Sequence, residues 1–170
     1  MNWTIRRAGL DDAEALALLG AATFLTAFAD VHTSAEIVEH CRDAHSVAAY
    51  HRLLAPSTDA WLVETASTGA PVGYAVLTEP GLELAGPGDL ELRRIYLLPG
   101  LHGGGAGAAL MQLVIERARE RGARRLLLGV YSLNGRALAY YRKHGFEQIG
   151  EHDFLVGETV YVDFVMARPV

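Results

Sequence analysis

The sequence has little cysteine, and this absence excludes two classes of protein. Cys41 is the single cysteine of the 170 residues, so an internal disulfide framework is excluded. It lies in a helical stretch without a ligand partner at metal spacing, and we expect it to be a core thiol. The seven histidines form no H-x-x-x-H pair that would hold zinc. The sequence therefore predicts no metal site.

An excess of positive charge is also missing. The formal net charge is −5, which argues against a nucleic-acid partner and is compatible with a cationic acceptor such as an amine. The uncharged run 15–29 is shorter than the roughly 20 residues of a membrane span. Asp11, Asp12 and Glu14 precede it, and acids at that place are wrong for a signal peptide. We predict a cytoplasmic protein with no membrane partner.

No linker or low-complexity run interrupts the chain, and its hydrophobic content of 51% suffices for one core. We therefore predict a single domain over residues 1–170. The periodicity predicts strands over 3–7, 60–65, 72–78, 90–97, 125–130, 150–156 and 159–166. It predicts helices over 11–28, 33–43 and 105–121, a shorter helix that begins at residue 46, and another helix that ends at residue 144. This order is typical of a mixed α/β sheet with helices on both faces.

Local helix-start signals support three of these helices. Asp11 with Glu14 and Thr33 with Glu36 have the spacing of capping pairs, and Ser46 opens a shorter helix. We expect these three helices to form a lid over the first strand. The segment between the strands 60–65 and 72–78 has the composition of a hairpin turn.

The most informative stretch runs from Leu97 to Leu110, where an apolar segment meets a glycine cluster that opens into a long helix. Glycines let the backbone take positive φ and approach a ligand closely. A helix that starts near Gly105 offers unpaired N–H groups and the positive end of its dipole. This arrangement predicts a pyrophosphate site.

Three related motifs fail in this sequence. A Walker loop needs lysine after its glycines, and Ala-Ala-Leu follows here. Gly103, Gly105 and Ala108 fit the loose G-x-G-x-x-A dinucleotide pattern, but the strand 125–130 is not followed by the required acid. The residues from His102 imitate an esterase oxyanion strip, yet no G-x-S-x-G elbow occurs. A glycine-rich surface turn that binds nothing remains the simpler alternative.

A second motif at a defined separation decides between these alternatives. The Q/R-x-x-G-x-G/A pattern, here with His102, Gly105 and Gly107, is followed by Asn134, Ala137, Tyr140-Tyr141 and Gly145-Phe146. Over essentially the whole chain, this order resembles the GNAT superfamily of acyl-CoA-dependent N-acetyltransferases. The resemblance implies a largely antiparallel central sheet and acetyl-CoA as co-substrate. His102 departs from the family pattern, and a neutral imidazole gives a weaker phosphate contact than arginine.

The resemblance also implies where acetyl-CoA binds. Its pantetheine arm would lie along the strand before the loop, taking main-chain hydrogen bonds as an added strand does. Its pyrophosphate would meet the glycine loop, and residues of the second motif would reach the arm. The implied residues are Ile95, Tyr96, Leu97, His102, Gly103, Gly104, Gly105, Ala106, Gly107, Ala108, Asn134, Ala137 and Tyr140.

Acetyl transfer to an amine needs a base and an acid. By resemblance, Glu91 would draw a proton from the amine, often through water; the alternative is an exposed strand carboxylate paired with Arg93. Tyr141 shares a helical stripe with Asn134, while Tyr140 turns away, so Tyr141 is the better acid. The alternative for Tyr141 is an aromatic core contact. Arg93 and Arg94 should point to opposite sheet faces.

The residues that bind the acceptor are expected in the least regular part of the sequence. The stretch around Phe24 and Phe28 is similar to bacterial acetyltransferases that act on polyamines, so we expect Phe24, Phe28 and Glu91 to contact the acceptor. We also expect acidic side chains to line the entrance to the acceptor site; the alternative is that they belong to solvated helix faces. These acids are Asp30, Glu36, Glu39, Glu79 and Glu83. Two alternatives for the function stay open: a protein or peptide N-terminal amine as acceptor, and a non-catalytic acyl-CoA-binding regulatory module. A homodimer stays open as the assembly.

Overall fold

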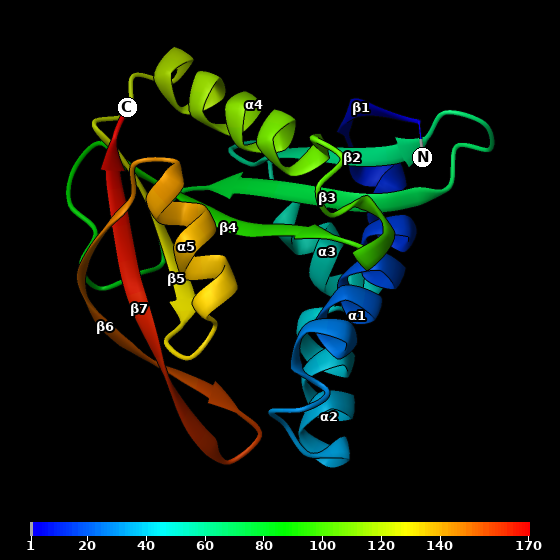
Figure 1. The fold of residues 1–170 in the computed structure, drawn as a ribbon, viewed down its shortest axis with the longest axis horizontal. Helices are drawn as coiled ribbons and strands as arrows, with labels where there is room; N and C mark the ends of the chain where they lie inside the picture. The colour runs from blue at the N-terminus through cyan, green and yellow to red at the C-terminus, as the bar shows by residue number, and fades with distance from the viewer. Residues whose placement is uncertain (1) are drawn as a thin grey trace.

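The computed structural model describes residues 2–170 and folds them around a seven-stranded sheet (Figure 1). The strands are β1 (Trp3–Ala8), β2 (Asp59–Thr65), β3 (Pro71–Thr78), β4 (Asp89–Leu97), β5 (Arg125–Tyr131), β6 (Glu147–Val156) and β7 (Thr159–Pro169). The helices are α1 (Ala13–Phe28), α2 (Ser34–Ala44), α3 (Val47–Leu53), α4 (Ala106–Glu120) and α5 (Gly135–Lys143), with short 3-10 turns η1 (Leu10–Asp12) and η2 (Pro99–Leu101). Over residues 2–170 the order is β1-β2-β3-β4-β5-β7-β6, and β4 with β5 is the one parallel pair.

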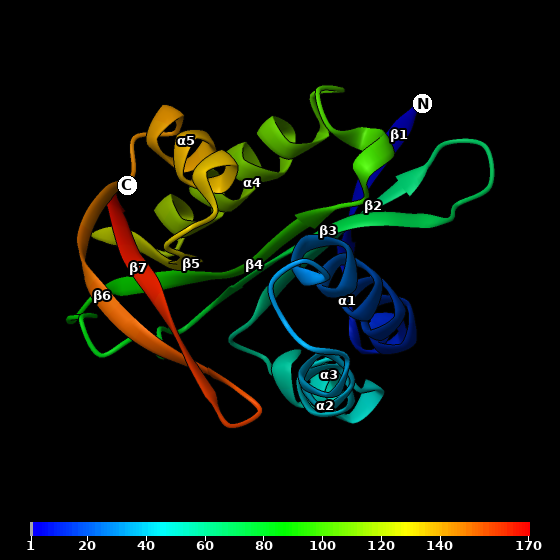
Figure 2. The ribbon, with the colours of Figure 1, turned by 60° about the horizontal axis from the view of Figure 1, so that its bottom comes forward.

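Helices cover both faces of the sheet (Figure 2). On one face α4 and α5 pack over the larger apolar core, where Leu110 and Met111 of α4 are fully buried. On the other face α1 and α3 pack against β2 and β3 through Leu16 and Tyr50. The predicted mixed α/β fold with a largely antiparallel sheet is confirmed. None of the helices formed by residues 2–170 combines the length and apolarity needed to span a bilayer.

Two of the three predicted helix starts are confirmed. The Thr33 hydroxyl accepts from the Glu36 amide at 3.3 Å while Glu36 accepts from the Thr33 amide at 2.7 Å, and Ser46 caps α3. The predicted capping pair of Asp11 and Glu14 is wrong. The carboxylate of Asp12 instead accepts from the Gly9 amide at 2.8 Å, because a 3-10 turn precedes α1.

The predicted lid over the first strand is also wrong. The smaller core that α1 and α3 share is made chiefly with β2 and β3, because those strands carry apolar side chains on both faces. β1 lies at the edge of the sheet and exposes much of its surface. The helices therefore cover β2 and β3, beside β4, which carries part of the candidate site.

Two irregularities of β4 shape the site. Val76 of β3 pairs with Arg94 and Leu77 pairs with Leu92, so Arg93 is an extra residue that forms a β-bulge. On its other side β4 pairs with β5 only from Asp89 to Glu91. Beyond Glu91 the two strands diverge, as Figure 1 shows, which leaves one edge of β4 unpaired.

Candidate active site

The glycine loop joins η2 to α4 and leaves a row of main-chain amides without an acceptor in the described part of the chain. Gly103 and Gly105 have φ of +80° and +82°, a conformation that favours glycine. The His102 and Gly104 amides donate to carbonyls within the loop. Five amides, however, donate to no acceptor among residues 2–170; they belong to Gly103, Gly105, Ala106, Gly107 and Ala108. The loop therefore presents unpaired donors to an anion.

The start of α4 carries nothing that would neutralise these amides. Gly105 is the N-cap and has no side chain to accept a hydrogen bond, and the first turn holds no acid. The positive end of the helix dipole therefore stays open for a ligand. The loop is held from outside: the Trp3 indole donates to the Gly104 carbonyl at 3.1 Å, and the Tyr140 hydroxyl donates to the Gly107 carbonyl at 2.8 Å.

His102 lies at the start of the loop and is exposed. Partial burial of its ring and the nearby Arg136 lower the pKa of the imidazole. The neutral form is thus favoured, the form for which the weaker phosphate contact was expected. Arg136 lies in the first turn of α5 and brings a permanent positive charge near the loop, a feature that the sequence motifs did not indicate.

The unpaired edge of β4 runs toward the loop. Ile95 and Leu97 pack toward the α4 core, and Tyr96 stacks on Tyr74 at a centroid distance of 5.9 Å on the other face. Their main-chain groups on the β5 side have no strand partner after Glu91. This edge has the geometry in which an extended chain adds to a sheet.

Asn134 and Ala137 lie where α5 begins. The Asn134 side-chain oxygen accepts from the Ala137 amide at 3.0 Å and caps the helix. That oxygen is therefore occupied by the protein, and the side-chain amide nitrogen has no hydrogen-bond partner within residues 2–170. Asn134 thus has a structural role in addition to any contact with a ligand.

Glu91 lies at the point where β4 and β5 begin to diverge. It is 5% exposed, so the expectation of an exposed carboxylate is wrong. One oxygen accepts from the Gly81 amide at 2.7 Å, and the other lies 3.5 Å from an Arg93 nitrogen. The loop 79–88 therefore fixes this carboxylate, and the expected pair with Arg93 also forms.

The expectation that Arg93 and Arg94 alternate across the sheet is wrong, because the bulge cancels the alternation. Arg93 reaches Glu91, while Arg94 pairs with Val76 on the same face. The Arg94 guanidinium lies 4.9 Å over the Tyr50 ring and donates to the Ala44 carbonyl at 2.9 Å. Its other terminal nitrogen is buried without a partner.

Tyr140 and Tyr141 of α5 both pack against the larger core. Burial, with smaller contributions from Tyr96 and Tyr140, raises the pKa of Tyr141 well above its usual value, so its hydroxyl keeps its proton. Tyr141 contacts Phe146 edge-on at 5.8 Å, so the expected aromatic core contact is present. Tyr141 packs against the core on the α4 and α5 side of the sheet, whereas Glu91 lies on the opposite face where β4 and β5 begin to diverge.

The predicted acceptor residues differ in their access to solvent. Phe24 is 4% exposed and stacks on His40 at 4.1 Å, so it forms the centre of an aromatic cluster. Phe28 is half-buried and its ring lies 6.3 Å from that of Tyr131 on β5. Phe28 is therefore the better placed of the two to contact a substrate.

The five acids do not gather at one entrance. Glu36 caps α2 and accepts from the Tyr161 hydroxyl at 3.4 Å, and with Glu39 it lies against the β6–β7 turn at Gly157. Glu79 pairs with Arg121 instead. Asp30 and Glu83 are exposed and make no ion pair within residues 2–170.

β5 and β7 bring further residues, which the sequence did not indicate, to the face of the sheet that holds Glu91. Tyr131, Tyr161 and Asp163 lie together because β5 pairs with β7 in an antiparallel register. The segment that holds Tyr161 and Asp163 was predicted to be a strand, but nothing in the sequence indicated which strand would lie beside it. The part of the chain that the structure describes holds no group of three or more metal-ligating side chains.

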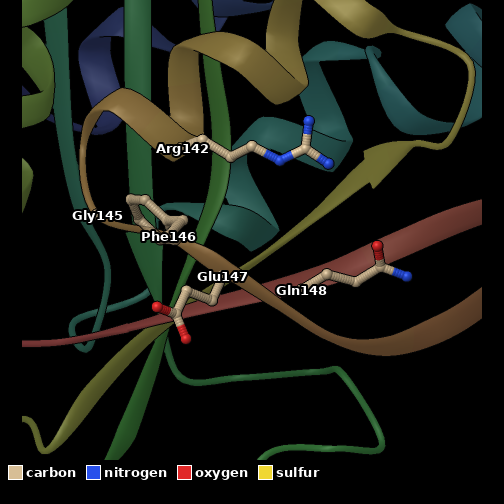
Figure 3. Close-up of a pocket in the computed structure, with 5 residues that line it drawn as sticks. All are labelled: Arg142, Gly145, Phe146, Glu147 and Gln148. Atoms are coloured by element: carbon tan, nitrogen blue, oxygen red, sulfur yellow. The ribbon is translucent and has the colours of Figure 1, made fainter.

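A hollow lies elsewhere, where α5 ends and β6 begins (Figure 3). Its lining residues are Arg142, Gly145, Phe146, Glu147 and Gln148. It is at the opposite end of α5 from Asn134, and none of the predicted site residues lines it. The hollow is therefore separate from the candidate active site.

The glycine loop and the diverging strands both lie in a segment that is similar to a known protein family. The model of the acetyltransferase (GNAT) family matches residues 25–146. The chain belongs to the GNAT acetyltransferase family. The family predicted from the glycine loop and the second motif is therefore confirmed. The matched segment contains both motifs and Glu91.

Individual relatives are similar over part or all of the chain. An uncharacterized N-acetyltransferase of Mycobacterium tuberculosis is 44% identical over 100 residues, which are 59% of this chain and 61% of that protein. The chain thus matches less than two thirds of the length of that curated relative. The PaiA N-acetyltransferase of Thermoplasma acidophilum, solved in complex with coenzyme A, has a TM-score of 0.79 at 19% identity over 100% of both chains. The acetyltransferase YncA of Salmonella typhimurium, solved with acetyl-CoA, has a TM-score of 0.70 at 20% identity over 99% of this chain and 94% of that one.

Proposed function

We propose that this GNAT family member transfers an acetyl group from acetyl-CoA to a primary amine by direct attack in a ternary complex. The observation that carries the proposal is the row of unpaired amides at the start of α4, beside the unpaired edge of β4. An anion binds such a helix start without needing a charged side chain. The thioester of acetyl-CoA supplies the acetyl group, and the amine bound near the diverging strands receives it as the C–S bond breaks and the thiolate of coenzyme A leaves.

Acetyl-CoA is the co-substrate that fits these two features. The pyrophosphate would meet the loop from Gly103 to Ala108, and the pantetheine arm would pair with β4 from Ile95 to Leu97. The coenzyme A and acetyl-CoA complexes of PaiA and YncA support this choice, because those proteins share the fold. Arg136 would add a cation beside His102. Asn134, Ala137 and Tyr140 would lie along the arm.

Two residues would move protons in this mechanism. Glu91 would take the proton of the attacking amine, directly or through water, since its carboxylate is fixed by the Gly81 amide. Tyr141 would donate a proton to the departing thiolate from its protonated hydroxyl, although burial, which raises its pKa, makes the hydroxyl a weak acid. The amine would approach from the α1 face and the thiolate would leave toward α5.

The acceptor is a small amine such as a polyamine in this proposal. The aromatic residues at the end of α1, with Phe28 closest to β5, would form part of its site. A protein or peptide N-terminal amine is the second candidate acceptor. A non-catalytic acyl-CoA-binding module would use the same loop but would not need the fixed carboxylate of Glu91.

A thiol-release assay with acetyl-CoA and a panel of amines tests the proposal. We expect release of one thiol for each acetylated amine formed. Binding of acetyl-CoA without transfer to any amine or peptide would favour the non-catalytic module. Absence of acetyl-CoA binding in calorimetry would contradict the proposal as a whole.

A further inference from the structure

Asp163 on β7 is a half-buried carboxylate without a partner on the acceptor face. No hydrogen bond or ion pair from residues 2–170 reaches it. Its carboxylate lies over Gly129 of β5: a Cβ placed on Gly129 would be 3.7 Å from Asp163 Oδ2 and 3.8 Å from Leu82 Cδ2. The missing side chain of Gly129 therefore leaves space beside the carboxylate.

Aromatic rings lie on the same face of the sheet as this carboxylate. Tyr131 is its direct partner across the β5–β7 pairing, so the two side chains share a face of the sheet. Tyr161 precedes it by two residues on the same face, and the two tyrosine rings lie 6.1 Å apart at 78°. Phe28 contacts Tyr131 and His32 contacts Tyr161, which extends the aromatic wall.

Such a site is suited to a cation. Burial raises the pKa of Asp163 to about 6, and His152, opposite it on β6, offsets only part of that effect. A cation bound at the carboxylate would compensate for the lost hydration. Aromatic faces attract ammonium groups as well, and desolvated sites strengthen this attraction.

The bound cation is not the reacting amine. An amine must be neutral to attack a thioester, whereas a carboxylate with aromatic walls stabilises the protonated form. Glu91 pairs with Leu127 of β5, and Gly129 lies two residues further along the same face. Gly129 is about 7 Å from Leu127 along β5, and Glu91 lies one strand spacing of about 4.8 Å to the side, a gap between the two carboxylates that a short diamine can bridge.

We propose that Asp163, with the rings of Tyr131 and Tyr161, binds a second cationic group of the acceptor while the neutral amine of the same molecule lies near Glu91. The inference rests on the proposed function and narrows the acceptor to amines that carry another ammonium group at short distance. The site is thus a specificity site, separate from proton transfer.

The test compares two acceptors that differ only in the second charge, 1,4-diaminobutane and 1-aminobutane. With coenzyme A bound in place of acetyl-CoA, we expect the diamine to bind the parent protein about 10- to 100-fold more tightly, the range of a charge-assisted hydrogen bond. Asp163→Asn should remove this preference and leave the affinity for 1-aminobutane unchanged. Calorimetry measures binding, and thiol release measures kcat/KM for both amines.

Asp153→Asn is the matched control, because it makes the same charge change at an exposed residue of β6. Tyr131→Leu should reduce the diamine preference by about threefold through loss of the ring. Equal affinity of the parent for both amines, or an unchanged preference in Asp163→Asn, would overturn the inference. If the preference depends on Asp163 in binding while no acetyl transfer occurs, the inference holds and the proposed function fails.

Discussion

The two sides of the candidate site are built in different ways. The side proposed for acetyl-CoA comes chiefly from one contiguous segment, residues 95–108, with additions from the start of α5, and offers mainly main-chain groups. The side proposed for the acceptor combines α1, β5, β6 and β7, and offers side chains such as Phe28, Tyr131 and Asp163. A glycine-rich segment specifies main-chain geometry locally, whereas the acceptor side depends on which strands become neighbours.

The largest effect should follow from a change that affects only the acetyl-CoA side. Gly105→Val places a β-branched residue at φ +82°, which such residues almost never adopt, and it displaces the free amides. We expect acetyl-CoA binding to fall by about 100-fold or more, to the limit of detection by calorimetry. Gly100→Ala is the control, since Gly100 has ordinary φ and open space around it. Unchanged affinity in folded Gly105→Val would contradict the anion site.

Glu91→Gln tests the point where the two sides meet. The amide can still accept from the Gly81 N–H but cannot take a proton. Turnover should fall by about 10²- to 10⁴-fold, most strongly at low pH, where the acceptor amine is largely protonated. Acetyl-CoA affinity should be unchanged. Glu83→Gln, an exposed acid of the neighbouring loop, serves as control. A pH–rate profile identical to that of the parent would leave Glu91 with a structural role alone.

Tyr141→Phe tests the proton donor on the α5 side. The substitution removes the hydroxyl and keeps the contact with Phe146, so turnover should fall by about 10- to 1,000-fold with little change in acetyl-CoA affinity. Tyr140→Phe loses its bond to Gly107 and should be less stable by about 1 kcal/mol, yet turn over like the parent. Parent rates in both variants would mean that water or another group returns the proton.

Lowering the pH should destabilise the acceptor side of the fold first, because histidines pack in its interior. Burial lowers the pKa of His40 to about 4 and that of His45 to about 3. Unfolded histidine has a pKa of about 6.5, so below that pH the unfolded chain binds more protons. Each histidine should then reduce the free energy of unfolding by about 1.4 kcal/mol per pH unit until its folded pKa is reached. Denaturant titrations from pH 7 to 4 measure this slope. His45→Gln should lower it, and His51→Gln, at an exposed position of α3, should not.

The smallest effect should come from the cap of α2 on the acceptor side. Thr33→Ala removes the hydroxyl that accepts from the Glu36 amide and should cost about 1 kcal/mol in the free energy of unfolding. The KM for the amine should rise more than the KM for acetyl-CoA, because α2 lies against the β6–β7 hairpin. Ser34→Ala, at the next and exposed residue, is the control. Equal stability of Thr33→Ala and the parent would show that the capping box contributes little.

Several features were accessible from sequence because their causes are local. Gly103 and Gly105 specify positive φ wherever the loop lies, and Thr33 with Glu36 forms its capping box within four residues. The order of strands and helices, with two motifs at their expected separation, was enough to predict the family and the fold class. Predictions of this kind do not depend on distant neighbours.

Other features depended on long-range contacts. The bulge at Arg93 arises from the register with β3, and it brings Arg93 and Arg94 to one face although their positions predict alternation. Gly9 and Asp12 replaced the expected cap of α1 because a 3-10 turn precedes the helix. Glu91 is buried because the loop 79–88 folds back over it.

By itself the sequence determined the glycine loop, the helix that follows it and the order of the elements, because backbone conformation and periodicity are properties of neighbouring residues. The tertiary structure alone decided that β4 and β5 diverge after Glu91 and that Asp163 lies beside Tyr131 over Gly129. Strand pairing over a long loop fixes such contacts through the packing of the whole sheet, which no local pattern encodes.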